Sequence, residues 1–480
     1  MRSFCALFLS SVLLMSCAMG PDYSRPDIKT ADQFRMSDTE GESIANLPWW
    51  ELLHDEELQK LIRVALEENK NLQEAAASVE EFQARVFIER MEFAPQLSTQ
   101  LNAPVLGKFG GFARQGFPSN FSYFGIGNLN WEIDIWGRIR RSNEAAFGDL
   151  LAREENRRAV ILQLVSGVAG GYLELLQFDM QLDIAKRTLG SWEESVKIAR
   201  ARLRQGVSSR LDADQFEAER ANAAARVAQF ERLMVQKENE LSVFLGRNPF
   251  RIPRGQILTE QIFPPTVPPG LPSELLQRRP DIVQAEHELA AATARIGVAK
   301  AERFPKFSIT GILGLASPQL SSLVSSGSEF GQAGLGLAGP VFNAQILGFQ
   351  QEAVVAQAKQ VLAQYEQTIL VAFKEVEDAL VAVRTAESQG IAQQEQVTAL
   401  RSALRLADLR YKGGLTSYVD VLIAKRDLFN AELELTSTRR LHLVSMVQLY
   451  KALGGGWSPE SPEGTIAISS SSSEQSNPGN

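Results

Sequence analysis

The chain has 480 residues, of which 44% are hydrophobic and 22% are charged, a composition typical of folded proteins rather than of disordered chains. Its formal net charge of −8 argues against nucleic-acid binding, because proteins of that class usually carry a basic face. The only two cysteines, Cys5 and Cys17, lie near the N-terminus, so the sequence offers neither a disulfide framework nor a cysteine zinc site.

Residues 1–16 are typical of a secretory signal peptide. Arg2 supplies a positive charge, and the apolar stretch 4–15 is too short to span a bilayer. The run Leu14-Met15-Ser16-Cys17 resembles a bacterial lipobox, which predicts cleavage before Cys17 and a covalent lipid on it; the alternative is an ordinary signal peptide with an incidental cysteine. Ala18 favours the outer membrane over retention in the inner membrane. We therefore expect residues 17–50 to form a lipid-anchored N-terminal segment.

The rest of the chain contains an internal duplication of about 200 residues. Matching residues lie at constant offsets, as in the pairs Arg85/Arg295, Pro95/Pro305, Gly206/Gly414 and Asp212/Asp420. The Pro-rich stretch 263–270 cannot be helical and separates the two units. We therefore predict a first repeat at 51–262 and a second repeat at 271–457, followed by a disordered tail at 458–480 that is rich in Ser, Pro and Glu.

Each repeat predicts the same order of elements. A short helix comes first, then a β-hairpin, a very long helix, a glycine turn and a return helix. For the first repeat these are Leu72–Phe93, 96–136, 139–205 and 211–246; for the second they are Asp281–Arg303, 306–342, 344–412 and 417–454.

The long helices indicate coiled-coil packing. From Leu164 to Leu203 the apolar positions alternate spacings of four and three residues without interruption. At 1.5 Å per residue, a helix of this length would extend roughly 100 Å, which is too long for a globular domain. We expect a rod of antiparallel helices in which two shorter helices stacked end to end match one long helix.

The hairpins alternate apolar and polar residues in the manner of outer-membrane strands. Leu97, Leu101, Leu129 and Trp131 fall on one face, and the second repeat shows a weaker form of the pattern. We expect no membrane-spanning α-helix after the signal peptide, because no run of about 18 apolar residues follows it. A soluble two-hairpin sandwich is the alternative. Four strands cannot close a barrel, so a membrane role requires an oligomer: a dimer would give a filled barrel and a trimer one with room for a channel.

The chain resembles the TolC-like outer-membrane factor family, the exit ducts of tripartite efflux pumps and secretion systems. The motifs that carry the resemblance are Cys17–Pro26, Pro48-Trp49-Trp50, Trp131–Arg138, Leu276–Ile282, Gly339-Pro340-Val341-Phe342 and Leu449–Trp457. The resemblance implies a mainly α-helical homotrimer with a shared twelve-stranded outer-membrane β-barrel and a periplasmic α-barrel closed at its tip. It also implies two partners, a periplasmic adaptor and an inner-membrane pump.

Other functions have weaker support in the sequence. His287-Glu288 could begin an HExxH zinc motif, but position 291 is alanine, so the second ligand is missing. Adjacent acids such as Glu67-Glu68 point apart on a helix and indicate a solvated face. We therefore predict no enzyme activity, metal or cofactor besides the lipid on Cys17. The alternative to a passive efflux or type I secretion channel is a non-conducting coiled-coil lipoprotein that braces the envelope.

Two glycine turns are the candidate docking sites for the adaptor. Val207 and Leu415 are apolar at turns that should lie at the ends of the long helices, next to Gly206, Ser208, Gly414 and Thr416, and the family uses a similar motif in this way. Local packing between hairpins is the alternative. Charged residues near the turns are candidates for an aperture, with ordinary solvated charge as the alternative: Arg202, Asp212, Asp408, Arg410 and Asp420.

Overall fold

A computed structural model describes residues 18–28, 33–34, 55–102, 123–261, 272–317, 319–340 and 344–455. The predictions for the signal peptide, Cys17, the Pro-rich stretch and the tail lie outside these ranges. The chain divides into two compact units, and each is described by itself. Unit 1 comprises residues 1–28, 77–155 and 284–367, and unit 2 comprises residues 29–76, 156–283 and 368–480.

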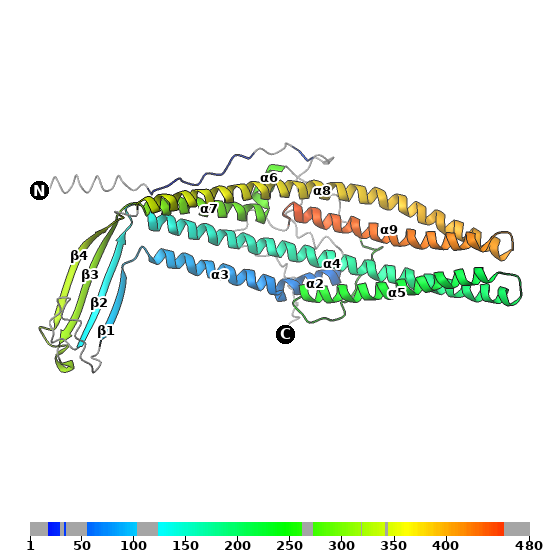
Figure 1. Ribbon diagram of the computed structural model, residues 1–480, viewed down its shortest axis with the longest axis horizontal. Helices are drawn as coiled ribbons and strands as arrows, with labels where there is room; N and C mark the ends of the chain where they lie inside the picture. The colour runs from blue at the N-terminus through cyan, green and yellow to red at the C-terminus, as the bar shows by residue number, and fades with distance from the viewer. Residues whose placement is uncertain are drawn as a thin grey trace, which may run out of the picture. The chain divides into compact units, whose positions relative to one another are not determined.

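The described part of the chain is mostly helical (Figure 1). In the first repeat the elements are α2 (Glu56–Glu68), α3 (Lys70–Met91), β1 (Gln96–Asn102), β2 (Tyr123–Ile133), α4 (Arg138–Arg204) and α5 (Arg210–Phe244). In the second they are α6 (Pro272–Arg278), α7 (Pro280–Ala301), β3 (Lys306–Ser317), the 3-10 turn η4 (Leu320–Ser322), β4 (Glu329–Ala338), α8 (Ala344–Lys412) and α9 (Tyr418–Ala452). The short helices α2 and α6 were not predicted as separate elements, because each is too short to show a sustained apolar period.

The four strands form one antiparallel sheet in the order β1-β2-β3-β4 (Figure 1). Its register places the predicted apolar residues of all four strands on the same face: Leu97 pairs with Leu129, Leu129 with Gly311, and Gly311 with Ala333. The opposite face carries polar side chains, because Ser98 pairs with Asn128 and Gln96 with Asn130. The sheet therefore has one apolar and one mainly polar face, and β1 and β4 are its edges.

Leucines on the apolar face lie over glycines of the neighbouring strand. A Cβ on Gly125 would come within 3.0 Å of Leu101 Cδ2, and one on Gly331 within 3.4 Å of Leu313 Cδ1. The same arrangement holds for Gly311 beside Leu129. These glycines allow large side chains to interdigitate without separating the strands.

The junction between β2 and α4 is built by local hydrogen bonds in unit 1. Asp134 accepts bonds from the N–H groups of Ile139 and Arg140 and so caps the first turn of α4. The Trp136 indole N–H donates to the carbonyl of Pro305 at 2.8 Å, and its ring stacks on Phe304 with centroids 4.7 Å apart. The junction of the first repeat is therefore tied to the end of α7 and the start of β3 in the second.

In unit 2 most of the apolar positions predicted from the 4-3 spacing of α4 are buried, and Phe178, Leu189 and Leu203 are partly buried. Leu164, Val168 and Leu175 belong to one core cluster, and Trp192, Val196 and Ala199 to another. A Cβ on Gly171 would lie 2.9 Å from Leu241 Cδ2, so this glycine lets α5 approach α4 closely. One 18-residue window of α4 is apolar enough to cross a membrane by composition (mean hydropathy 1.6), but 67% of it is buried within the protein, so packing accounts for it.

Side chains at corresponding positions of the two repeats bond to the ends of the return helices, although the residue types differ. The Asn69 amide donates to the carbonyl of Phe244 at 2.8 Å, and the Arg279 guanidinium donates to the carbonyl of Ala452 at 3.0 Å. Both residues precede the helix that leads to their repeat's hairpin. Arg279 also pairs with Asp281 and Glu375, and these bonds outweigh its burial and raise its pKa.

A buried carboxylate joins α2 to the rest of unit 2. Asp55 Oδ1 caps α2 by accepting from the N–H groups of Glu57 and Leu58. Its Oδ2 accepts from the Tyr172 hydroxyl, the Gln256 N–H and the Gln261 amide at 2.8–3.2 Å. Burial raises the pKa of Tyr172, and the Asp55 charge adds to this effect, so the phenol remains a hydrogen-bond donor.

Candidate functional site

The turn between α4 and α5 is a glycine-terminated helix end. Gly206 has a φ of +72°, the left-handed conformation that glycine adopts most readily. The N–H of Gly206 donates to the carbonyl of Leu203, and that of Val207 to the carbonyl of Arg202, both at 3.0 Å. This is the Schellman arrangement, which satisfies the last carbonyls of the helix. Val207 follows with 73% of its surface exposed.

The turn between α8 and α9 repeats this geometry. Gly414 has a φ of +73°, and its N–H donates to the carbonyl of Tyr411. The N–H of Leu415 donates to the carbonyl of Arg410 at 2.8 Å, and Leu415 is 77% exposed. The two turns thus present the same motif, an apolar side chain directly after a left-handed glycine.

Hydroxyl and carboxyl side chains cap the helices that leave the turns. Ser209 and Asp212 form a reciprocal capping box at the start of α5, and Ser208 also donates to Asp212. Partial burial acts to raise the pKa of Asp212, but hydrogen bonds from Ser208 and Ser209 outweigh this effect, so the pKa is lowered. Because its folded-state pKa is depressed, the stabilisation by this group is present at neutral pH and is lost only as acid protonates the carboxylate. At the second turn Ser417 caps α9, and Thr416 donates to Asp420.

Most of the predicted aperture charges make local contacts. The Arg202 guanidinium lies over the Tyr411 ring, 4.4 Å from its centroid, and Asp408 pairs with Lys412 on the same helix at 2.6 Å. Asp212 and Asp420 serve the caps, and Arg410 contributes its backbone carbonyl to the second turn. The structure brings Arg202 to the second hairpin but does not join the five side chains into one cluster.

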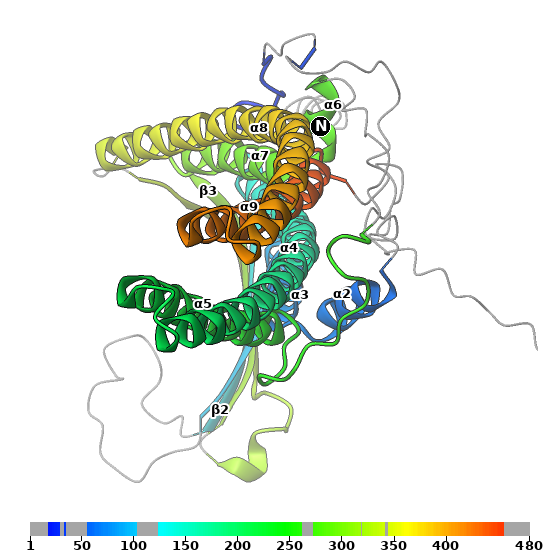
Figure 2. The ribbon, with the colours of Figure 1, turned by 90° about the vertical axis from the view of Figure 1, so that its right-hand side faces the viewer.

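Contacts between the hairpins α4–α5 and α8–α9 form a feature that was not predicted from the sequence. Figure 2 shows α5 beside α4 and α9 beside α8 in unit 2. The rings of Trp192, Phe216 and Tyr418 pack in series, with centroids 6.0 Å and 5.7 Å apart, and the Tyr418 hydroxyl donates to Gln215. These residues come from three helices, so no local period in the sequence could have identified them.

A partly buried lysine strengthens the connection between the hairpins. Lys425 Nζ on α9 donates to Ser195 Oγ at 2.7 Å and to the Ser191 carbonyl at 3.1 Å, and it lies 5.1 Å from the Trp192 ring centroid. Burial lowers the pKa of Lys425 despite the nearby charges of Asp408 and Glu194. Its bonds go to neutral groups on α4, so it connects the two hairpins directly.

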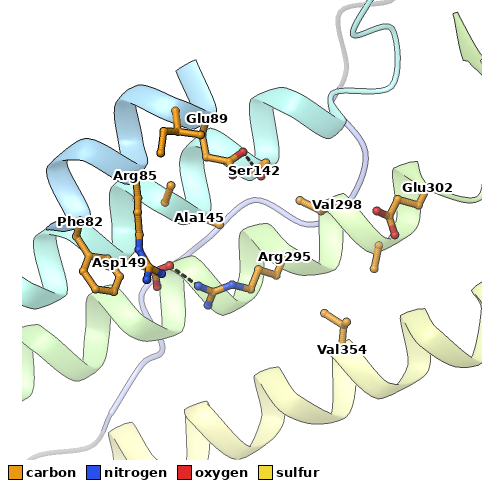
Figure 3. A pocket seen from close by; sticks show the side chains of 13 residues that line it. Phe82, Arg85, Glu89, Ser142, Ala145, Asp149, Arg295, Val298, Glu302 and Val354 are labelled. Atoms are coloured by element: carbon orange, nitrogen blue, oxygen red, sulfur yellow. Dashed lines mark hydrogen bonds and ion pairs between the residues drawn. The ribbon is translucent and has the colours of Figure 1, made fainter. Parts of the chain in front are cut away.

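Unit 1 contains a hollow of about 520 Å³ lined by α3, α4, α7 and α8 (Figure 3). Two pairs of its polar side chains bond within it: Arg295 pairs with Asp149, and Ser142 donates to Glu89 at 2.6 Å. The residues that line the hollow include no histidine or cysteine. Among the described residues no group of three or more His, Cys, Asp or Glu is arranged to hold a metal.

The amino-acid sequence matches a known protein family and several of its members. The family described as outer membrane efflux protein matches the chain twice, over residues 61–247 and 271–455. The probable efflux pump outer membrane protein TtgC of Pseudomonas putida is 34% identical over 482 residues, covering 95% of this chain and 96% of the relative. The cation efflux system protein CusC of Escherichia coli is 33% identical over 94% of this chain and 98% of the relative.

Solved structures share the fold. The open MtrE outer membrane channel of Neisseria gonorrhoeae is 32% identical, with a TM-score of 0.81 over 92% of this chain and 99% of that one. The CmeC outer membrane channel of Campylobacter jejuni has a TM-score of 0.83 at 23% identity, over 92% and 96% of the two chains, a likeness of fold alone.

Proposed function

This chain belongs to the outer membrane efflux protein family, and from that premise we propose that it is a passive channel whose barrel is completed by three copies and whose two glycine turns receive a periplasmic adaptor. It is the outer-membrane component of an efflux system and a transport protein, not an enzyme. It works as a homotrimer with an adaptor and an inner-membrane pump, which supplies the energy.

The two-faced sheet carries this proposal. Its apolar face suits lipid and its polar face suits a water-filled interior, yet β1 and β4 have no further strand beside them in the described sheet. Unpaired strand edges are not tolerated in a bilayer. We therefore assign β1 of one chain to pair with β4 of the next, so that three chains close twelve strands. Exposed apolar side chains on the helices that adjoin the edge strands, Met91 on α3 and Phe349 on α8, fit the same junction.

Conductance of the purified oligomer in planar bilayers tests the channel. We expect the wild type to conduct, and we expect the double variant Tyr418→Phe/Lys425→Met to conduct more, because it removes the side-chain hydrogen bonds that Tyr418 and Lys425 make at the contacts between the hairpins. The control is Val324→Asp, a substitution at an exposed position in the β3–β4 loop, away from the contacts between the hairpins. If neither the wild type nor the double variant conducts, the non-conducting brace is the better description.

A covalent lipid on Cys17 is the second part of the proposal. The lipobox pattern supports it, and Cys17 is the only thiol left after the predicted cleavage. Cys17→Ser should therefore abolish labelling by radioactive palmitate while the protein is still exported, because export depends on the preceding signal peptide. The label is measured on the immunoprecipitated protein. Label retained in Cys17→Ser would contradict the lipid assignment.

The substrate is set upstream of this channel. Relatives of similar sequence are named for toluene, for solvents, for antibiotics and for cations. Ducts of one family therefore serve systems that export molecules of opposite polarity. We propose that the inner-membrane pump selects the substrate and that this chain conducts what the pump delivers.

A further inference from the structure

Residues 18–25, here called the strap, form neither helix nor strand and lie against the rest of unit 1. The N–H of Met19 donates to the carbonyl of Trp136 at 3.0 Å, and the Met19 carbonyl accepts from Arg141 Nε. Arg141 Nη2 also bonds to Asp22 at 2.6 Å. The beginning of the strap is thus fastened to the β2–α4 junction of the first repeat.

The end of the strap is fastened to the second repeat. The Tyr23 hydroxyl donates to Glu286 on α7 at 3.2 Å, and Arg25 forms a two-pronged ion pair with the same carboxylate. One glutamate therefore receives both donors from the strap. Two-pronged arginine–carboxylate pairs fix orientation as well as distance.

Between these fastenings, glycines let the backbones of strap and helix touch. A Cβ on Gly297 of α7 would lie 2.5 Å from the Met19 carbonyl oxygen, and one on Gly20 would lie 2.5 Å from Gly297 Cα. A Cβ on Gly137 would lie 2.7 Å from Ala18 Cβ. Gly20 and Gly137 also have φ values of +97° and +75°. The glycines at 20, 137 and 297 therefore allow the strap to lie in backbone contact with α7 and with the start of α4.

We propose that the strap is a lock that clamps the two repeats together at the strand–helix junction and fixes the lipid anchor at that level. Ala18, the residue that follows Cys17 in the sequence, lies against the β2–α4 junction, because a Cβ on Gly137 would lie 2.8 Å from Ala18 Cα. The inference rests on the proposed lipid on Cys17 only for the position of the anchor. The clamp itself stands on the contacts of residues 18–25.

Gly297→Ala tests the lock. If the strap is a lock, this substitution should destabilise the protein, whereas the same substitution in a helix without a strap should stabilise it. Alanine favours a helix more than glycine does, so without the strap this change in α7 should stabilise the protein. With the strap, the new Cβ displaces the Met19 carbonyl and releases the segment. We expect chymotrypsin to cleave after Tyr23 about tenfold faster or more, because proteolysis follows the population of the open form. The trimer should also dissociate at a lower temperature.

Two further variants complete the test. Gly20→Ala disrupts the same contact from the strap side and should behave like Gly297→Ala. Gly348→Ala on α8, where an added Cβ meets nothing within 4 Å, should be as resistant as the wild type. Cleavage is read by N-terminal sequencing of the large fragment, which should begin at Ser24. Unchanged cleavage and heat stability in both strap variants would overturn the lock, whereas absence of palmitate from the wild type would overturn only the lipid.

Discussion

Replacing Leu415 or Val207 with aspartate is expected to abolish transport and adaptor cross-linking while leaving the trimer intact. Each side chain follows a left-handed glycine and is more than two-thirds exposed, so it contributes little to the packing of its own chain. Burying such a side chain against a partner contributes about 1.5–3 kcal/mol, and an aspartate there would also have to lose its hydration. Because each of the three chains presents both turns, the loss of adaptor-binding free energy occurs at every copy in the trimer.

The measurement pairs whole-cell efflux with site-specific cross-linking to the adaptor. Trimer yield and outer-membrane location should stay at wild-type levels, because the Schellman hydrogen bonds involve backbone groups that aspartate retains. Val324→Asp again serves as the control, since it adds the same charge at an exposed apolar position in another loop. Wild-type transport by both turn variants would show that the adaptor docks elsewhere.

Asp55→Asn is expected to destabilise the fold by about 3 kcal/mol or more, since each buried donor left unsatisfied costs about 1–3 kcal/mol. The carboxylate accepts from two N–H groups on Oδ1 and from three donors on Oδ2. The asparagine amide can keep only one of these sets. If the amide oxygen accepts the two bonds at the cap of α2, the NH₂ group faces the three donors and cannot accept from them. If the amide is flipped, its oxygen accepts from those three donors and the cap of α2 is lost.

Loss of helical circular dichroism with heat or urea measures this effect, together with the yield of assembled protein. Glu56→Gln is the matched control: it neutralises an exposed acid in the same helical turn and should change stability by no more than about 0.5 kcal/mol. If Asp55→Asn and the wild type unfold at the same temperature and urea concentration, Asp55 does not hold α2 against Tyr172 and the segment around Gln256.

Local patterns in the sequence were sufficient to predict the long elements. The 4-3 spacing predicted α4 because coiled-coil packing repeats every seven residues, and the helix begins and ends within one residue of the expected bounds. Alternation predicted the strands and their apolar face, since side chains on a strand alternate between the two faces. The exposed turns followed from glycine after each long helix.

Features that depend on distant residues could not be predicted in this way. In the sequence Lys425 resembles any other surface lysine of an amphipathic helix, and only the packing of α9 against α4 partly covers it. Asp55 and Gln261 are far apart in sequence, and nothing local marks them as partners. The helices α2 and α6 owe their stability to tertiary contacts more than to propensity, which is the usual case for short helices.

The strap also constrains the order in which the molecule matures. Its partners lie far along the chain: Asp22 bonds to a residue 119 positions later, and Tyr23 to one 263 positions later. A secreted chain enters the periplasm with its N-terminus first, so these residues arrive before the helices that hold them exist. Such distant contacts close slowly because the intervening chain must first be ordered. The first segment to be exported is therefore among the last to be fixed, and its seating marks the completion of both repeats.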